Sequence, residues 1–259
     1  MEAAQGAAAP PDVVVSEGDG TVDGTTGYGG PLATRRRAAG LVVEVVPLTQ
    51  RRPNEAELAA PAHVVSGGTT GVGAGAAWLQ ATRDALGPVL DRALAGRSSI
   101  VGICFGAQLI ARELAGPASV GVHPGGLQAG LVEVRDAVAL AGAEGSGEPA
   151  GIVSSFHYHW IEPWPIEAAG GRILLESERT PVQAFEVGAT VRGLQFHPEL
   201  EPRQLRHALR VNRSVVERHL VSMGALNRSI AAAGRRWDTA LWECLVLDPI
   251  SRVRPAVAA

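Results

Sequence analysis

Three residues of this 259-residue chain have the types and surroundings needed for nucleophilic catalysis. Cys104 stands between Gly102 and Gly106, directly after the apolar run 99–101 and directly before a stretch with helical patterning. A cysteine at the first turn of a helix faces unpaired backbone N–H groups and the positive end of the helix dipole, which favour a thiolate. The pattern therefore predicts a strand, a sharp turn that carries a nucleophile, and a helix.

His197 and Glu199 supply a base for this nucleophile and an orienting group for the base. Both follow residues 191–194, which have the pattern of a strand. His197 would activate Cys104, and Glu199 would hold the imidazole in the required tautomer. Each residue also has a structural explanation, since a lone cysteine is usually a small buried hydrophobe and a His-Glu pair could lie at a surface helix. Together the three favour catalysis.

The segment GICFGAQ at 102–108, combined with QFHPE at 195–199, resembles the class I (triad) glutamine amidotransferases, specifically the GMP-synthase-type glutaminase domain. The likeness extends from about Asp12 to Leu200. It implies that Cys104 attacks the side-chain amide of L-glutamine, that ammonia leaves, and that water then cleaves a γ-glutamyl thioester. No metal and no organic cofactor is expected for this half-reaction.

The same resemblance assigns an oxyanion hole. Gly67, Gly68 and Thr69 match the glycine-rich oxyanion strand of the family, in which proline usually stands where this chain has Thr69. The backbone N–H groups of Gly68 and Phe105 would bind the oxyanion, and Gly67 and Thr69 would lie against the substrate. A turn without a catalytic role is the alternative for the two glycines.

Five further residues are expected at the substrate by resemblance. Gln108 would bind the glutamine, and Gln128 would lie near the mouth of the pocket. The segment of His157, Tyr158 and His159 would hold the α-amino and carboxylate groups, although His159 stands where a small or acidic residue is expected. The two alternating histidines also leave a metal site open, but no third ligand has a recognisable spacing.

Short apolar runs alternate with helical patterns, which predicts an α/β fold with an open, mostly parallel sheet flanked by helices, of flavodoxin-like type. Helices are expected at 31–39 and at 76–94, the second interrupted or kinked by Gly87-Pro88. Because such sheets bind ligands beyond the carboxyl ends of their strands, Cys104 and His197 should meet there. Strands are predicted at residues 13–15, 41–46, 63–66, 99–101, 131–134, 151–155, 173–176, 183–187 and 191–195.

The chain divides into three parts by pattern. Residues 1–11 read as a flexible tail, residues 12–200 as the amidotransferase domain, and residues 201–259 as a helical C-terminal extension. One amphipathic helix is expected over 205–223. The later segment, with Trp237 and Trp242, is too apolar for an unpacked tail, so it should pack on the domain or form an interface, including one between copies of the chain.

The glycine- and threonine-rich segment 17–30 has two interpretations. It is either a mobile surface loop or a lid beside the active site. It contains neither a P-loop motif nor a strict GxGxxG motif, so nucleotide binding by this segment is not expected.

Composition excludes several functions. The net charge is −3 and the longest run of like charge is Arg35 to Arg37, so neither nucleic acid nor an anionic membrane is an expected partner. No stretch reaches the ~20 apolar residues of a membrane span. The two cysteines lie far apart in the sequence, and one is needed as a thiolate, which argues for a reducing compartment and a cytoplasmic location.

Three functions stay open at this point. The first is a glutaminase subunit that supplies ammonia to a separate synthetase or synthase, since no ATP-binding or acceptor domain can be found in these residues. The second is a stand-alone hydrolase or transferase of another γ-glutamyl amide, an alternative that Thr69 and His159 motivate. The third is a non-catalytic regulatory subunit that keeps the fold, against which the intact triad counts.

Overall fold

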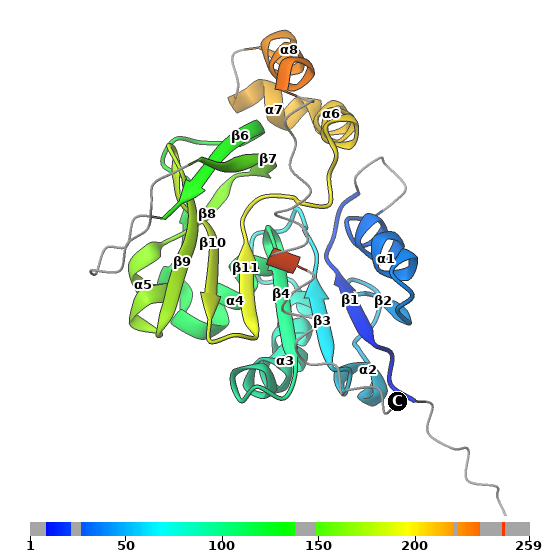
Figure 1. Cartoon of the computed structure of the whole chain (residues 1–259). Helices are drawn as coiled ribbons and strands as arrows, with labels where there is room; N and C mark the ends of the chain where they lie inside the picture. The colour runs from blue at the N-terminus through cyan, green and yellow to red at the C-terminus, as the bar shows by residue number, and fades with distance from the viewer. Residues whose placement is uncertain (1–8, 22–26, 138–148, 220–221, 234–244, 247–259) are drawn as a thin grey trace, which may run out of the picture.

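The computed structural model describes residues 9–21, 27–137, 149–219, 222–233 and 245–246. These residues form a nine-stranded sheet with helices on both faces (Figure 1). The strand order is β2-β1-β3-β4-β11-β10-β9-β6-β7. The first five strands run parallel and the remaining neighbours are antiparallel. The predicted α/β class is confirmed, with the antiparallel strands gathered at one side.

The parallel strands are short, and all except the edge strand β2 are largely buried, as the sequence indicates for a sheet that is covered on both faces. They are β1 (Val13–Glu17), β2 (Val43–Pro47), β3 (Ala62–Val65), β4 (Ser99–Ile103) and β11 (Val191–Leu194). The antiparallel strands are β6 (Gln128–Asp136), β7 (Pro149–His157), β9 (Gly171–Ser177) and β10 (Thr180–Val187). A separate two-stranded sheet joins β5 (Val120–Val122) and β8 (His159–Ile161).

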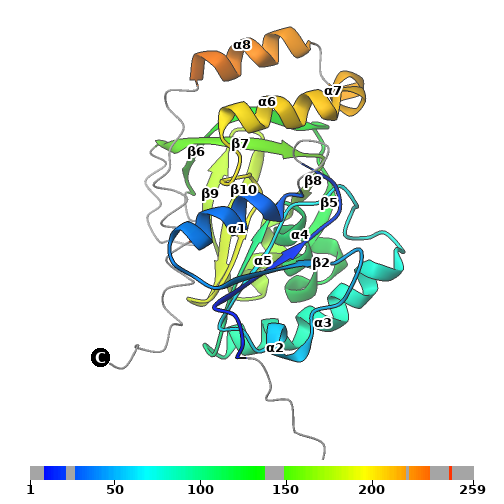
Figure 2. The same cartoon turned by 90° about the vertical axis from the view of Figure 1, so that its right-hand side faces the viewer.

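The helices divide between the two faces of the sheet (Figure 2). One face packs against α1 (Gly29–Ala38), and the other packs against α3 (Ala77–Leu94), α4 (Phe105–Ala115) and α5 (Pro163–Ala168). Two short helical segments complete the domain, α2 (Glu55–Leu58) and the 3-10 turn η1 (Pro117–Ser119).

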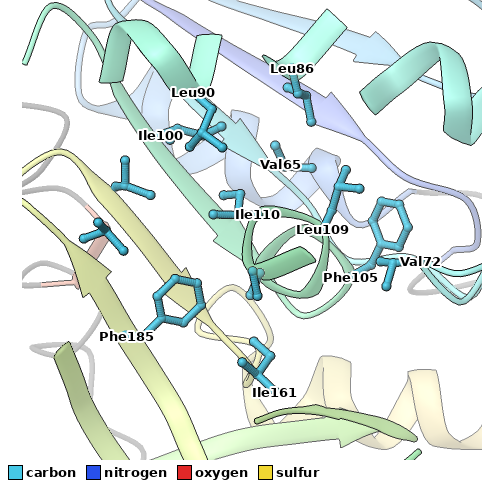
Figure 3. Packing of buried hydrophobic residues seen from close by; sticks show 14 of the residues in the cluster. Val65, Val72, Leu86, Leu90, Ile100, Phe105, Leu109, Ile110, Ile161 and Phe185 are labelled. Carbon is cyan, nitrogen blue, oxygen red and sulfur yellow. The ribbon is translucent and has the colours of Figure 1, made fainter. Parts of the chain in front are cut away.

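Alternating residues of the central strands build two apolar layers. Val64 and Val101 face the α1 side, whereas Val65 and Ile100 face the α3 and α4 side. Figure 3 shows Val65 and Ile100 packing with Ile110 of α4 in this second layer. Burying one such side chain stabilises a fold by about 2 kcal/mol. The turn between β4 and α4 is therefore held between two filled layers.

Helix α3 is continuous through Pro88, so Gly87-Pro88 does not interrupt it, while the alternative of a kink stays a prediction. A proline removes one helical hydrogen bond and crowds the residue before it. Glycine is the residue that relieves this crowding best, because it has no Cβ. Gly87 therefore lets the chain stay helical at a position where a larger residue would be pushed into an extended conformation.

The described part of the C-terminal extension contains three helices, and the single helix predicted over 205–223 is divided at Asn212. They are α6 (Pro202–Val211), α7 (Arg213–His219) and α8 (Met223–Ala233). The chain turns at Asn212, whose side-chain amide donates to the Ala208 carbonyl at 2.9 Å. Asparagine side chains compete in this way for backbone groups and are poor helix formers. Figures 1 and 2 show α6, α7 and α8 stacked at one end of the molecule, over β6 and β7.

An apolar cluster fixes these helices to the domain. Its buried members are Leu127, Leu205, Leu209, Val216 and Ile230. Farther along the chain, Leu245 and Val246 are buried in the α1-side layer, and Arg36 of α1 donates to the Val246 carbonyl at 2.9 Å. Residues 1–8, Trp237 and Trp242 lie outside the described residues. Among those described, no helix is long and apolar enough to cross a membrane.

Candidate active site

Cys104 occupies a strained position between β4 and α4. It has φ 49° and ψ −104°, and among the described residues it is the one non-glycine residue with a positive φ. Such a conformation costs of order 1–3 kcal/mol and persists only where the surrounding structure enforces it. A Cβ on Gly102 would lie 2.5 Å from the Gly106 carbonyl oxygen. The two flanking glycines are therefore required by the close packing of this turn.

The thiol of Cys104 points toward the antiparallel part of the sheet. Its Sγ atom lies 3.8 Å from the Phe156 carbonyl oxygen and 4.0 Å from Nε2 of Gln195. The backbone N–H of Cys104 donates to the Leu194 carbonyl at 2.7 Å, which ties the turn to the end of β11. The side chain is only 5% exposed, so water is largely kept from the sulfur.

His197 lies between Cys104 and Glu199. Its Nδ1 donates to Oε1 of Glu199 at 2.7 Å, and Cys104 lies near enough to affect the charge of the imidazole. Burial alone lowers the pKa of His197, but the charges of Glu199 and Cys104 and the hydrogen bonds to both raise this pKa well above its usual value. The geometry therefore stabilises an imidazolium beside the sulfur, as a thiolate–imidazolium pair requires.

Tyr28 is a site residue that the sequence did not reveal. Its ring lies 5.4 Å from the imidazole of His197, and it is 2% exposed. Burial raises the pKa of Tyr28, and the nearby charges of Cys104, Glu199 and Asp19 raise it further. The phenol therefore stays protonated and neutral next to the triad. It was missed because it belongs to the segment 17–30, which reads as a loop.

Gly67 and Gly68 lie close against other residues of the site. A Cβ on Gly67 would lie 2.9 Å from Cε1 of His197. A Cβ on Gly68 would lie 2.9 Å from Oδ1 of Asp19 and 3.2 Å from Cγ of Phe105. Only glycine fits at either position without a shift of its neighbours. The strand end that the sequence interpreted as an oxyanion strand thus lies directly beside His197 and the first residue of α4.

Asp19 is a second residue that the sequence analysis missed. Its carboxylate accepts hydrogen bonds from the backbone N–H groups of Thr69 and Thr70, both at 2.9 Å, and from both threonine hydroxyls, at 2.7 Å. Proline, the usual family residue where this chain has Thr69, could make neither the N–H nor the hydroxyl contact. Thr69, which is unusual at this position, therefore has a specific hydrogen-bond acceptor in Asp19, 50 residues earlier in the chain.

The predicted substrate segment lies beside this loop. Nε2 of Gln108 donates to the His159 carbonyl at 3.2 Å. The His159 ring lies against Gly71, where a Cβ would be 3.1 Å from its Cε1. Tyr158 is 38% exposed, and its ring contacts those of His159 and His219. Contacts between neighbouring residues therefore run from Gln108 of α4 through His159 and Tyr158 to the end of α7.

Gln128 and His157 lie deeper than the sequence suggested. Gln128, expected near the pocket mouth, is 3% exposed, and its Oε1 lies 2.7 Å from Nε2 of His157 and 2.8 Å from the Thr180 hydroxyl. Nδ1 of His157 donates to the His159 carbonyl at 2.9 Å. These contacts hold both side chains inside the sheet, and the substrate contacts expected for them stay a prediction.

Two buried histidines predict acid sensitivity. Burial lowers the pKa of His157 to about 3 and that of His63 to about 4. An unfolded histidine titrates near pH 6.5, so between about pH 6.5 and 4 the unfolded chain binds protons that the folded chain does not. Stability should fall as the pH falls, by up to about 1.4 kcal/mol per pH unit for each histidine.

Urea unfolding at several pH values checks this expectation. His63→Gln is the informative variant, because Nε2 of His63 contacts the Ala60 carbonyl at 3.1 Å, away from the thiol. The slope of unfolding free energy against pH should be shallower in the variant than in the wild type. Equal slopes would show that His63 is not held neutral in the fold.

No group of three or more His, Cys, Asp or Glu side chains suited to a metal ion occurs in the described part of the chain. Metal binding by His157 and His159 therefore gains no third ligand from those residues. Cys104 is a free thiol. Cys244 lies outside the described residues.

Comparison with known proteins agrees with this geometry. The family model described as glutamine amidotransferase class-I matches residues 21–215. A GMP synthase [glutamine-hydrolyzing] from Aeropyrum pernix is 31% identical over 199 residues, which cover 76% of this chain and 35% of that protein. The chain therefore spans about a third of the length of this curated relative.

Solved structures show the same fold. A glutamine amidotransferase from Thermotoga maritima matches with a TM-score of 0.68 and 17% identity, covering 92% of this chain and 97% of that one. One from Methylobacillus flagellatus matches with a TM-score of 0.58 and 19% identity, covering 89% and 94%. The chain belongs to the class-I glutamine amidotransferase family, and the enzyme class predicted from its motifs is confirmed. The GMP synthase relative agrees with the GMP-synthase-type resemblance.

Proposed function

We propose that the chain is a glutaminase that removes the side-chain amide of L-glutamine through Cys104. The observation that carries the proposal is the position of Cys104 in a strained turn, in contact with a buried His197 that is itself bound to Glu199. A buried imidazole held between a carboxylate and a thiol is the arrangement of a nucleophile, a base and an orienting group.

The reaction proceeds in two balanced steps. The Cys104 thiolate attacks the carboxamide carbon, and the tetrahedral oxyanion is bound by the N–H groups of Gly68 and Phe105. His197 gives its Nε2 proton to the nitrogen, the C–N bond breaks, ammonia leaves, and a γ-glutamyl thioester remains. His197 then takes a proton from water, the hydroxide attacks the thioester, and glutamate departs as the thiolate is restored.

The ammonia is used outside these 259 residues. Ammonia becomes ammonium in water, so efficient transfer needs an acceptor that receives it through a shielded path. The GMP synthase relative extends well beyond the matched region, which supports a synthetase as the acceptor.

We place the reaction in a reducing cytoplasm, because Cys104 must remain a thiol. Division into a tail (1–11), a catalytic domain (12–200) and an extension (201–259) remains part of this proposal.

A second candidate is hydrolysis or transfer of another γ-glutamyl amide. It is motivated by Thr69 and His159, which stand where the family usually has proline and a small or acidic residue. The His159 ring lies against Gly71, close to the loop that contains Thr69. A non-catalytic regulatory role is disfavoured, because the proposed triad is assembled with close contacts.

A substrate comparison separates these candidates. We expect kcat/KM for glutamine to exceed that for γ-glutamyl anilide, γ-glutamylmethylamide and γ-glutamylcysteine by at least ~10²-fold, because the site must release the small leaving group ammonia. Glutamate release is measured for each compound with the same preparation. A higher kcat/KM for any larger amide would replace the glutaminase proposal with the hydrolase alternative.

A further inference from the structure

We propose that Asp19 is a positioning residue, which clamps the oxyanion loop (residues 66–70) in the conformation needed to bind the tetrahedral intermediate. The inference rests on the proposed function, since the loop matters only if an oxyanion forms. Asp19 stands two residues after the end of β1, and the loop begins directly after the end of β3. The parallel pairing of these strands brings the two segments together.

One carboxylate satisfies four donors of the loop. Oδ1 accepts the backbone N–H groups of Thr69 and Thr70 at 2.9 Å each, and Oδ2 accepts the two hydroxyls at 2.7 Å each. The acceptor is charged and the distances are short, two features of the stronger hydrogen bonds in proteins. The loop backbone immediately after Gly68 is therefore fixed at two successive peptide groups.

The loop is also held at Ser66, by both the β1 turn and the start of α4. The Ser66 carbonyl accepts the Gly106 N–H at 3.2 Å, and the Ser66 hydroxyl accepts the Gly18 N–H at 3.2 Å. The Ser66 hydroxyl in turn donates to the Gly67 carbonyl at 3.0 Å. The loop thus lies between the turn that carries Asp19 and the helix that begins at Phe105. Of the anchors on the β1 side, Asp19 is the only charged one among the described residues.

The clamp has a functional consequence because Gly67 and Gly68 are adjacent. A peptide group between two glycines rotates easily, and a rotated Gly68 N–H would not point at the oxyanion. Misplacing one donor of an oxyanion hole costs ~10²-fold or more in kcat. Fixing the N–H groups of the next two residues restricts this rotation before substrate arrives.

The clamp is formed at neutral pH. Burial tends to raise the pKa of Asp19, but the hydrogen bonds from Thr69 and Thr70 outweigh it and lower this pKa from its usual value of 3.8. Because the folded-state pKa is depressed, the ionised clamp is complete above pH 3.8 and is lost only as the pH falls through the lower, folded-state value. The loop is therefore held throughout the range in which Cys104 and His197 would work.

Asp19→Asn tests the proposal because it keeps the shape and replaces an acceptor oxygen with a donor. We expect kcat for glutamine to fall ~10–100-fold while KM changes little. Alkylation of Cys104 by iodoacetamide should stay within ~2-fold of the wild type, because this displacement forms no tetrahedral oxyanion. Asp12→Asn is the matched control. The Asp12 carboxylate also accepts a backbone N–H, that of Val42 at 2.8 Å, but near the opposite end of β1.

The outcomes are distinct. A wild-type kcat in Asp19→Asn would overturn the clamp. The clamp would also be overturned if Asp19→Asn lost turnover and alkylation to the same extent, with or without a lowered urea midpoint. Equal losses indicate a general disruption of the site. If the wild type releases glutamate from neither glutamine nor any γ-glutamyl amide, the proposed function fails and the clamp fails with it. The clamp is supported if Asp19→Asn loses turnover but keeps its alkylation rate, while Asp12→Asn keeps both.

Discussion

Replacing Cys104 with alanine is expected to lower glutamate release from glutamine by ~10⁴-fold or more. The variant keeps the carboxylate, the imidazole and the oxyanion donors, but no atom can form the thioester. Residual turnover would come from binding and the oxyanion hole alone. Coupled detection of glutamate, with enough enzyme to quantify the residual rate, makes the measurement.

The control for this variant is the fold itself. Alanine is smaller than cysteine and tolerates a positive φ no better, so the substitution could change the stability of the fold. Far-UV circular dichroism and the urea unfolding midpoint of the variant should therefore be recorded beside the assay. A folded Cys104→Ala protein that keeps more than about a tenth of the wild-type rate would remove Cys104 from the mechanism.

Gly106→Ala is expected to cost about 3 kcal/mol or more of unfolding free energy. A Cβ on Gly106 would lie 2.1 Å from the Val65 carbonyl oxygen and 2.7 Å from its carbonyl carbon. Both atoms belong to the backbone of β3, a central strand paired on each side, so they cannot move aside cheaply. The turn at Cys104 would shift as well, and activity would be lost with it.

Gly224→Ala is the matched control for this loss of stability. Gly224 is likewise the second residue of its helix, but a Cβ there would meet only side-chain atoms of Ser222 and Arg228 at 3.5 Å. Alanine is favoured over glycine in helices, so this change should be neutral or stabilising by up to about 1 kcal/mol. Urea unfolding of both variants provides the comparison, and equal stability of the two would contradict the packing argument.

Local sequence patterns were sufficient to find the strands of the nine-stranded sheet and the turn at Cys104, whereas the short strands β5 and β8 were not predicted. Each follows from short-range rules, such as apolar runs for buried strands and small residues around a sharp turn. The meeting of Cys104 and His197 follows from one topological rule, since both stand at the carboxyl ends of strands, and β4 and β11 prove to be neighbours.

Tyr28 and Asp19 could not be predicted in the same way. Their segment has no periodicity, and their importance depends on which distant residues the fold brings to them. Asp19 meets Thr69 only because β1 and β3 pair in parallel register. The burial of Gln128 likewise could not be foreseen, since its partners His157 and Thr180 lie on other strands. The break at Asn212 was missed because a helical pattern of apolar residues continues across it.

The most direct test of the account is to trap the intermediate. The chain is mixed with glutamine, quenched in acid within the first turnovers, digested, and examined by mass spectrometry. The account predicts a γ-glutamyl group on the peptide that contains Cys104, released by hydroxylamine, and no adduct in Cys104→Ala. An adduct on a different residue, or glutamine turnover undiminished in Cys104→Ala, would contradict it.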